Sequence, residues 1–245
     1  MAENPFDVLQ DRGFVQQCTD EEAVRQLFEE TTVTAYVGYD PTASSLHVGH
    51  LFTTMPMVHL ERLGHRPLCV LGGGTARVGD PSGKTEMRQL LQEETITDNI
   101  EHFRSQFDAL LDVSGGKTRL VDNAEWLLEL NYIDFLRDVG RHFSVNRMLA
   151  AEAYKMRLER GLSFIEFNYQ LLQAYDFVQL RRRYNCRLQM GGDDQWGNIL
   201  AGVDLSRRLD QETVYGLTFP LQLTATEKCT GKTVAGAVWS PTQSA

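Results

Sequence analysis

A nearly uninterrupted apolar run that ends in glycines, RPLCVLGGG at residues 66–74, constrains the fold most strongly. Such a run is typical of a strand buried on both faces of a parallel sheet. It follows a β-branched and aromatic segment, VTAYVGY at 33–39, and a predicted helix over residues 48–63 that ends at Gly64. Because strand, loop, helix and strand occur in this order, we predict an α/β fold with a doubly wound parallel sheet.

The rest of the chain predicts how this sheet is extended. Residues 95–111 have the pattern of an amphipathic helix, and TRLVDN at 118–123 that of another strand. A mostly helical block covers about 124–185, and an α/β portion returns with CRLQMGGDDQWGN at 186–198. We therefore predict one Rossmann-type nucleotide-binding domain over residues 1–245, with a mostly helical insertion.

Two short helices are predicted before the first strand. Asn4 followed by Pro5 is typical of a helix N-cap and first turn, and Gly13 is suited to ending that helix. The segment TDEE at 19–22 predicts a capping box, with Thr19 as the N-cap of the second helix.

Charge and cysteine content narrow the class of protein. The formal net charge of −9 argues against a protein that holds nucleic acid by its overall charge. The four cysteines are widely separated and form no CxxC pair, which indicates reduced thiols. No apolar run approaches the roughly 18 residues that a membrane-spanning helix needs. We therefore predict a cytoplasmic protein that does not enter a membrane.

Two histidines three residues apart, His47 and His50 in the segment LHVGH, permit three interpretations: a zinc site, capping and packing, or stabilisation of an anion. A zinc site needs further ligands at suitable spacing, and neither an HExxH pattern nor a cysteine cluster is present. The pair follows the carboxyl end of a predicted strand, where α/β sheets bind ligands and helix N-termini attract phosphate. Gly49 would let a ligand approach the backbone. We interpret the histidines as donors to phosphate and predict no protein-ligated metal.

A second glycine-rich loop, GDPSGKTEMR at 79–88, offers Asp80, Lys84 and Arg88 to polar ligands. It does not match the P-loop pattern, because the position that would need the first glycine is Val78. A simple turn made by its Asp-Pro and Ser-Gly pairs remains the alternative.

Two further segments carry polar groups in suggestive places. Tyr169, Gln173 and Asp176 share one face of a predicted helix, which favours either a lined pocket or a buried structural network. QMGGDDQWG at 189–197 places acids and an amide directly after glycines at a strand end, a position suited to ribose or ammonium groups.

Taken together, five segments resemble the catalytic domain of bacterial-type tyrosyl-tRNA synthetases, which are class I aminoacyl-tRNA synthetases. The segments are YVGYDPTASSLHVGH, GDPSGKTEMR, HFSVNRM, YQLLQAYDF and QMGGDDQWGN. HVGH is similar to the HIGH signature of that class, and the resemblance extends from about residue 5 to Trp239.

The resemblance implies an activity and a set of partners. Members of the family bind L-tyrosine and ATP with Mg²⁺, form tyrosyl-adenylate and pyrophosphate, and pass the tyrosyl group to tRNA(Tyr). It further implies a homodimer, with the interface in the helical insertion. Tryptophanyl specificity within the same fold is disfavoured by Tyr36.

The resemblance also assigns residues by position. For tyrosine, Tyr36 and Asp176 would contact the phenol, and Asp80, Tyr169 and Gln173 the ammonium group, with Gln189 in the same site. Thr42, His47 and His50 would stabilise the ATP phosphates, and Lys84 and Arg88 would meet pyrophosphate. The adenosine and ribose side would be lined by Gly38, Asp40, Gly49, Gly192, Asp194 and Gln195.

Two departures from the family pattern lead to an alternative. In the expected signature loop at 226–234, Cys229 stands in place of the first of two lysines, and Lys232 provides the second. The chain also ends at Ala245, without the anticodon-binding domain and RNA-binding tail, so we expect it to contact tRNA weakly and only at the acceptor end. The alternative is a degenerate paralogue that binds tyrosine or RNA with little catalysis.

Overall fold

The computed structural model describes residues 3–81, 91–150, 154–155, 158–159 and 161–221. Within them, one sheet of six strands has the order β1-β6-β5-β2-β3-β4, and only the pairing of β1 with β6 is antiparallel. The strands are β1 (Gln17–Cys18), β2 (Thr34–Tyr39), β3 (Arg66–Leu71), β4 (Arg119–Asp122), β5 (Cys186–Gly192) and β6 (Tyr215–Phe219).

The order of the strands creates a crevice at one edge of the sheet. From β2 the chain proceeds outward through β3 and β4, whereas β5 and β6 extend the sheet in the opposite direction. The winding therefore reverses between β2 and β5, and ligands of such sheets bind beyond the carboxyl ends of the strands at this point. The predicted doubly wound α/β fold is confirmed.

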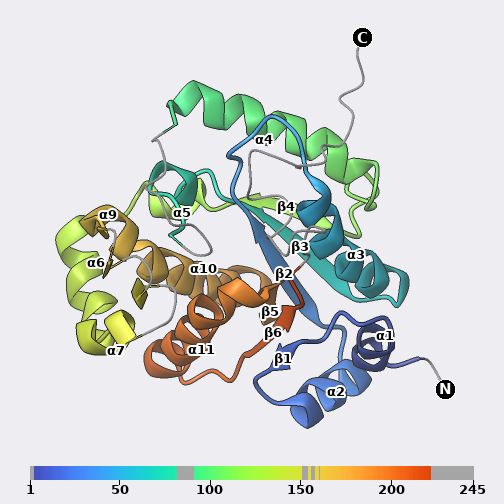
Figure 1. Cartoon of the computed structure of the whole chain (residues 1–245). Coiled ribbons are helices and arrows are strands. Elements are labelled where there is room, and N and C mark those ends of the chain that lie inside the picture. Colours follow the sequence, from blue (N-terminus) through green and yellow to red (C-terminus); the bar gives the residue numbers. More distant parts are fainter. Residues whose placement is uncertain (1–2, 82–90, 151–153, 156–157, 160, 222–245) are drawn as a thin grey trace.

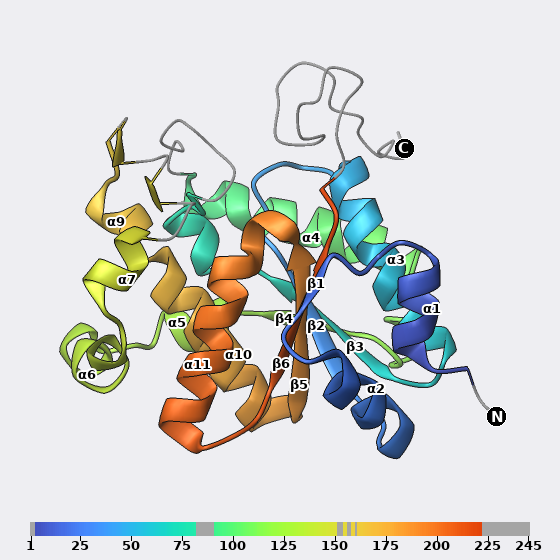
Figure 2. The same ribbon diagram turned by 60° about the horizontal axis from the view of Figure 1, so that its bottom comes forward.

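Helices cover both faces of the sheet (Figure 1). The longer ones are α1 (Pro5–Asp11), α2 (Glu21–Glu30), α3 (Val48–Arg62), α4 (Glu93–Asp108), α10 (Tyr169–Tyr184) and α11 (Trp196–Asp210). The shorter ones are α5 (Ala124–Leu127), α6 (Tyr132–Asp138), α7 (Val145–Ala150) and α9 (Phe164–Phe167), with 3-10 turns η1 (Thr75–Arg77), η2 (Gly140–His142) and η3 (Asp193–Gln195). Figure 2 shows α10 and α11 on the opposite side of the sheet from α1 and α3.

Side chains along β2 point alternately to the two faces of the sheet, so its two tyrosines pack in different apolar cores. Val37 and Tyr39 pack in the apolar cluster of α1 to α4, whereas Tyr36 packs with Phe177 of α10 on the other face. Successive side chains of a strand point to opposite faces, so this division follows from the backbone. Tyr36 is thereby directed toward the helix that carries Asp176.

The two predicted N-caps near the start of the chain had different outcomes, and the helix predicted over 95–111 is α4 at Glu93–Asp108. Asn4 caps α1, as predicted, and its side chain accepts a hydrogen bond from the amide of Phe6 at 2.9 Å. The capping box at Thr19 was wrong, because α2 begins at Glu21 and its cap is Asp20, which accepts from the amide of Ala23 at 3.0 Å. Asp is as good an N-cap as Thr, so the pattern did not distinguish them.

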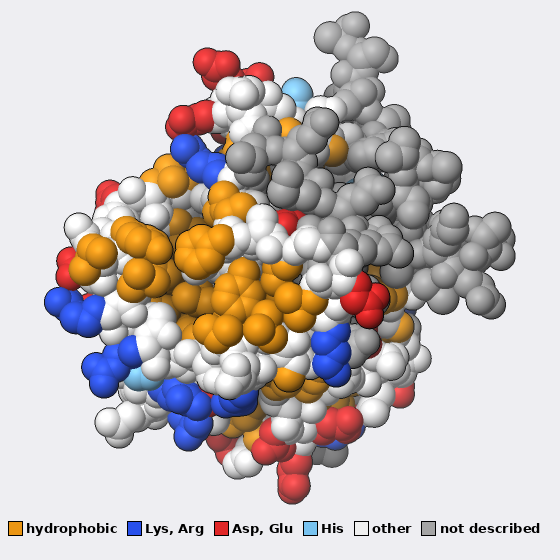
Figure 3. Space-filling view, turned by 60° about the vertical axis from the view of Figure 1, so that its left-hand side comes forward, with side chains coloured by type: hydrophobic (Ala, Val, Ile, Leu, Met, Phe, Trp, Pro, Cys, Tyr) orange, Lys and Arg blue, Asp and Glu red, His pale blue; other side chains and the backbone are white. Residues whose placement is uncertain are grey.

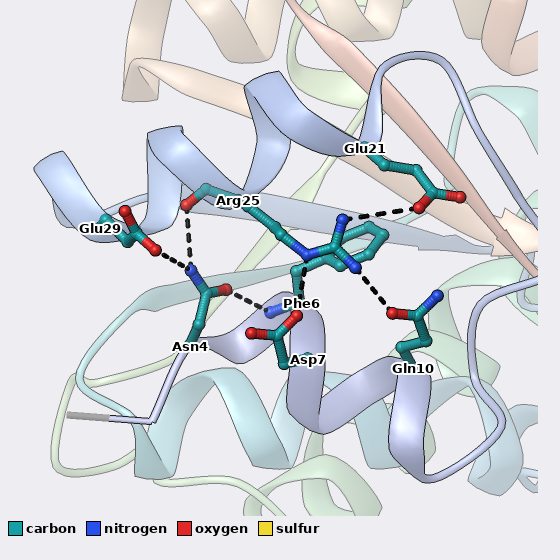
Figure 4. A network of polar contacts seen from close by, with 7 residues as sticks. All are labelled: Asn4, Phe6, Asp7, Gln10, Glu21, Arg25 and Glu29. Carbon is teal, nitrogen blue, oxygen red and sulfur yellow. Dashed lines mark hydrogen bonds and ion pairs between the residues drawn. The ribbon is translucent and has the colours of Figure 1, made fainter. Parts of the chain in front are cut away.

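A polar network joins α1 to α2 (Figure 4). The Arg25 guanidinium lies over the ring of Phe6 at 4.3 Å and donates to Asp7 at 2.8 Å and to Gln10 at 2.7 Å. Asn4 donates to the carbonyl of Arg25 at 3.1 Å. These contacts fix the N-terminal helices against each other, away from the crevice.

The block predicted to be mostly helical is confirmed as mostly helical in its described residues, with short irregular connections at 128–131, 143–144 and 161–163. From α5 to α10 the described residues contain helices and turns and no strand. The long α10 begins at Tyr169 and runs beneath the sheet, so it delivers the three polar residues of the predicted pocket from one helix. The assignment of this block as an insertion within a single domain stays a prediction.

Candidate active site

Asp176 lies in a buried polar cluster where α10 packs against β2. Its Oδ1 accepts from the indole nitrogen of Trp126 at 2.7 Å, and its Oδ2 accepts from Nδ2 of Asn123 at 2.9 Å. Burial raises the pKa of the Asp176 carboxyl to about 8, although these two hydrogen bonds oppose the rise. Burial, together with the nearby Asp176 charge, also raises the pKa of Tyr36.

Two polar atoms on β2 and α10 are buried without a protein partner. Within the described residues, the Tyr36 hydroxyl and the Gln173 Oε1 have no hydrogen-bond partner. An unpaired buried polar atom costs roughly 1–3 kcal/mol, and a native protein rarely tolerates it without a reason. Both residues were predicted to contact tyrosine, and that contact stays a prediction.

Gln189 lies next to Tyr36 on the neighbouring strand, since the two are direct partners in the pairing of β2 with β5. Its Oε1 is also buried without a partner among the described residues. A Cβ added at Gly202 of α11 would lie 3.2 Å from this oxygen, so the oxygen is on the side packed against α11. Contact between Gln189 and tyrosine stays a prediction.

A chain of hydrogen bonds connects Asp176 to Asp40, which directly follows β2. Asn123 donates to the Thr75 hydroxyl at 3.0 Å, and Thr75 donates to Oδ1 of Asp40 at 2.7 Å. The Tyr169 hydroxyl donates to Oδ2 of Asp40 at 3.0 Å. A side chain at Gly72 would strike Asp40, because its Cβ would lie 2.0 Å from the carboxylate. The glycine is therefore required for this approach.

Asp80 is held from the other side of the crevice. Gln195 donates to Oδ2 of Asp80 at 2.9 Å, and Asn198 donates to Oε1 of Gln195 at 3.1 Å. The sequence placed Gln195 on the adenosine side and did not foresee its contact with Asp80. Asp194 lies beside Gly192, where an added Cβ would come within 2.7 Å of the carboxylate. At Gly38 an added Cβ would meet nothing within 4 Å, so the end of β2 is open.

His47 and His50 cap the N-terminus of α3 with each other. The amide of His50 donates to Nδ1 of His47 at 3.2 Å, and the amide of His47 lies 3.5 Å from Nδ1 of His50. Their rings are stacked, with centroids 3.6 Å apart. Because each Nδ1 accepts an amide hydrogen, each neutral ring carries its own hydrogen on Nε2. The capping alternative is therefore realised through the two Nδ1 atoms, and this capping is compatible with a hydrogen on each Nε2.

The other residues predicted for phosphate divide into two groups. The exposed Thr42 follows β2, and its amide donates to the carbonyl of Asp40 at 2.8 Å, while Gly49 lies in the first turn of α3. Lys84 and Arg88, together with Cys229 and Lys232 of the signature loop, lie outside the described residues. Their predicted roles stay predictions.

Sequence reasoning missed the residues that connect the site. Thr75, Asn123 and Trp126 join Asp40 to Asp176, although none of them belongs to a recognised motif. Asn123 directly follows β4, so its place at the carboxyl end of a predicted strand was the signal that could have found it.

Two other classes of site are absent from the described part of the chain. No group of three or more His, Cys, Asp or Glu side chains in it could hold a metal ion. None of its helices has the length and apolar character needed to cross a membrane.

The fold and site define a doubly wound α/β protein with polar side chains and a helix N-terminus at the carboxyl ends of its strands, the position where proteins of this class bind nucleotides. Comparison with known proteins gives the family. The model described as tRNA synthetases class I (W and Y) matches residues 29–240, and the chain belongs to this family. The resemblance found in the motifs is confirmed.

Individual relatives agree with the tyrosine branch of the family. The chain is 56% identical over 234 residues to the tyrosine--tRNA ligase of Caldanaerobacter subterraneus subsp. tengcongensis, covering 96% of this chain and 58% of that protein. It is 60% identical over 235 residues to that of Desulfosudis oleivorans, covering 95% and 54%. The chain thus spans a little over half the length of these relatives.

A solved structure supports the same fold. A C-terminally truncated mitochondrial tyrosyl-tRNA synthetase from Aspergillus nidulans superimposes with a TM-score of 0.82 at 29% identity. The match covers 93% of this chain and 71% of that chain.

Proposed function

We propose that this chain activates L-tyrosine with ATP, forming tyrosyl-adenylate and pyrophosphate, for transfer to tRNA(Tyr). The observation that carries the proposal is the Tyr36 hydroxyl, which is buried without a partner among the described residues and lies near enough to the buried Asp176 for that charge to raise the Tyr36 pKa. Gln173, on the same helix as Asp176, has a second buried oxygen without a partner in the described structure. The names of the relatives support the same reaction.

The phenol of the substrate would enter between Tyr36 and Asp176. Each Asp176 oxygen already accepts one hydrogen bond, from Trp126 or Asn123. With its pKa raised to about 8 the carboxyl is mostly neutral near pH 7, and its carbonyl oxygen has room to accept a second hydrogen bond. A phenol can accept from Tyr36 and donate to Asp176, so both groups would be satisfied together. Phenylalanine would leave them unpaired, and tyrosyl-tRNA synthetases are themselves the known example of this effect, with discrimination of about 10⁴–10⁵-fold.

The ammonium group would lie among acceptors further along the crevice. Gln173 Oε1 has no partner in the described structure, and Asp80 is fixed by Gln195. Tyr169, from the same helix as Gln173, is held against Asp40. These contacts orient the acceptors before the ligand arrives, which lowers the entropy lost on binding.

For the chemical step, the tyrosine carboxylate would attack the α-phosphorus of ATP, and pyrophosphate would leave. The Nε2 hydrogens of His47 and His50, together with Thr42, would stabilise charge on the phosphates as it develops. Gly38, Asp40, Gly49, Gly192, Asp194 and Gln195 would line the nucleotide. Lys84, Arg88 and Lys232 would supply positive charge to the departing pyrophosphate, and Mg²⁺ would arrive with ATP as part of the substrate.

We also propose that the chain forms a homodimer through an apolar surface on its helical part. We define this surface by its most exposed apolar side chains: Leu128, Tyr132, Ile133, Val145 and Phe164. Ile133 is 68% and Phe164 70% exposed, and Figure 3 shows apolar side chains gathered at the centre of this face. Monomeric proteins seldom expose large contiguous apolar patches, so a second copy is the occupant that we favour.

The setting of the reaction follows from its partners. The acceptor end of tRNA(Tyr) would meet the activated tyrosine at the crevice. We place the reaction in the cytoplasm, where tRNA and ATP occur together. Cys18, Cys69 and Cys186 are free thiols, as a reducing compartment would leave them.

Direct detection of the product tests the proposed activity. Incubation with tyrosine, ATP, Mg²⁺ and pyrophosphatase should yield enzyme-bound tyrosyl-adenylate at no more than one molecule per site. The matched Asp176→Ala variant should lose most of this product, because tyrosine no longer binds. Tyrosine binding by the parent chain without any adenylate would instead support the degenerate paralogue.

A further inference from the structure

Helix α4 lies along the loop that joins β2 to α3, and one stripe of α4 faces that loop (Figure 1). Asn99, Phe103 and Gln106 are spaced by four and three residues, so they project from the same side of the helix. Asn99 and Phe103 are buried, and Gln106 is half-buried.

The two polar residues of this stripe hold opposite ends of the loop. Nδ2 of Asn99 donates to the carbonyl of Pro41 at 2.9 Å, next to Thr42. Oε1 of Gln106 accepts from the amide of Leu46 at 2.8 Å, next to His47. A carbonyl can only accept and an amide N–H can only donate, so the orientation of both side-chain amides is determined.

Phe103, midway between them, contacts a predicted catalytic ring. It is fully buried, and its ring meets the His50 imidazole edge to face at a centroid distance of 5.6 Å. Tyr39 meets the same imidazole at 5.9 Å, and His47 stacks on it at 3.6 Å. The position of His50 therefore depends on α4 as well as on its own helix.

We propose that Asn99 and Gln106 are positioning residues for the phosphate-binding loop at 41–47. They do not touch the substrate, and they act by fixing the backbone that carries Thr42, His47 and His50. The inference rests on the proposed function, because it assigns the loop to the ATP phosphates. It also explains why a short polar loop beside a helix N-terminus needs two side chains from a helix more than 50 residues away in the sequence.

Loss of either hydrogen bond from α4 to the loop should affect the rate of adenylate formation and not the binding of tyrosine. A misplacement of about 1 Å in a group that stabilises a transition state can cost about 100-fold in rate. The tyrosine pocket at Tyr36 and Asp176 is built from β2, α5 and α10 and does not include α4. Loss of either tether should therefore slow adenylate formation while tyrosine affinity stays the same.

Replacement of each side-chain amide by the isosteric acid tests the positioning role, because Asn99 acts as a donor, which the acid loses, and Gln106 acts as an acceptor, which the acid keeps. Asn99→Asp loses the donor and places a carboxylate against the Pro41 carbonyl, so we expect kcat for ATP–pyrophosphate exchange to fall by about 10-fold to 100-fold. Gln106→Glu keeps the acceptor for the Leu46 amide, so we expect a fall of less than about threefold, whereas Gln106→Leu should lose about 10-fold or more. The two acids carry the same added charge. Ser105→Asp, on the exposed side of α4, controls for that charge.

Two further readouts separate positioning from general loss of structure. The dissociation constant for tyrosine should change by less than about twofold in all of these variants. Hydrogen exchange at the Leu46 amide should speed up in Gln106→Leu and stay slow in Gln106→Glu, because only the second keeps the acceptor. Because Gln106 is half-buried, its variants stay informative even if Asn99→Asp does not fold.

The outcomes distinguish this inference from the proposed function. Equal rates of ATP–pyrophosphate exchange in the parent chain, Gln106→Glu and Gln106→Leu would overturn the inference and leave the proposed tyrosine activation intact. Unchanged Leu46 hydrogen exchange in Gln106→Leu would overturn it independently of activity. If the parent chain forms no adenylate, the proposed function is overturned. Faster hydrogen exchange at the Leu46 amide in Gln106→Leu would in that case still support the tether between Gln106 and the loop.

Discussion

Replacement of Tyr36 by Phe should stabilise the free protein and weaken tyrosine binding. The Tyr36 hydroxyl is buried without a partner among the described residues. Its removal relieves part of a penalty of roughly 1–3 kcal/mol, so we expect the free energy of unfolding to rise by about 1 kcal/mol. The bound phenol would lose one neutral hydrogen bond, worth about 0.5–1.5 kcal/mol, so tyrosine affinity should fall by roughly threefold to tenfold.

Tyr39→Phe is the matched control, since it changes the same atom on the same strand. The Tyr39 hydroxyl is paired with Thr54 at 3.1 Å, on the opposite face of the sheet. We expect this variant to lose about 1 kcal/mol of stability and to bind tyrosine as the parent does. Urea unfolding without ligand gives the stability, and calorimetric titration gives the affinities for tyrosine and phenylalanine.

The opposite pattern in Tyr36→Phe would refute this role for the hydroxyl. A loss of stability of about 1 kcal/mol or more, with tyrosine affinity unchanged, would mean that the hydroxyl serves the fold and not the ligand. Selectivity gives a second criterion. Phenylalanine leaves the hydroxyl unpaired whether bound or not, so its affinity should stay constant while that of tyrosine falls.

Three further predictions concern other parts of the site. The pKa of the Asp176 carboxyl is raised from 3.8 to about 8, so its contribution to the free energy of unfolding is fully present below about pH 4 and is lost as pH rises toward 8. Urea unfolding should therefore show a lower free energy of unfolding at pH 8 than at pH 5, and Asp176→Asn should make this difference smaller. His47→Asn keeps a helix cap but removes the Nε2 donor, so it should raise the activation free energy of adenylate formation by about 2–4 kcal/mol. Tyrosine affinity, measured by equilibrium dialysis, should stay unchanged. Cys229→Lys should raise the rate of adenylate formation at least about tenfold, or about 1.4 kcal/mol, whereas abolition of parent activity by Lys228→Ala would show that Lys228 already supplies the charge.

Much of the fold could be predicted because periodicity reports it directly. The buried run at 66–71 and the helix at 48–62 lie where the pattern placed them, since strand and helix differ in how often apolar residues recur. The N-cap at Asp20 was missed by one residue, because adjacent Thr and Asp are both good caps.

The site could be predicted only in part, because its contacts join distant segments. Tyr36 and Asp176 were recognised from motifs, and both side chains are buried, while their contact with tyrosine stays a prediction. Asn123, which donates to Asp176 from 53 positions away, belongs to no recognised motif, and only its place directly after a predicted strand could have drawn attention to it. Capping or packing by His47 and His50 was among the alternatives, but that the two histidines cap each other through Nδ1 could be seen only in the geometry.

Exchange between ATP and labelled pyrophosphate tests the central claim most directly, because it requires reversible formation of the adenylate and nothing later. With saturating ATP and Mg²⁺, the 245-residue chain should catalyse exchange with tyrosine, and exchange with phenylalanine or tryptophan should be weaker by at least about 1,000-fold in kcat/KM. Exchange that is equal with tyrosine and phenylalanine, or that does not depend on an amino acid, would contradict the account.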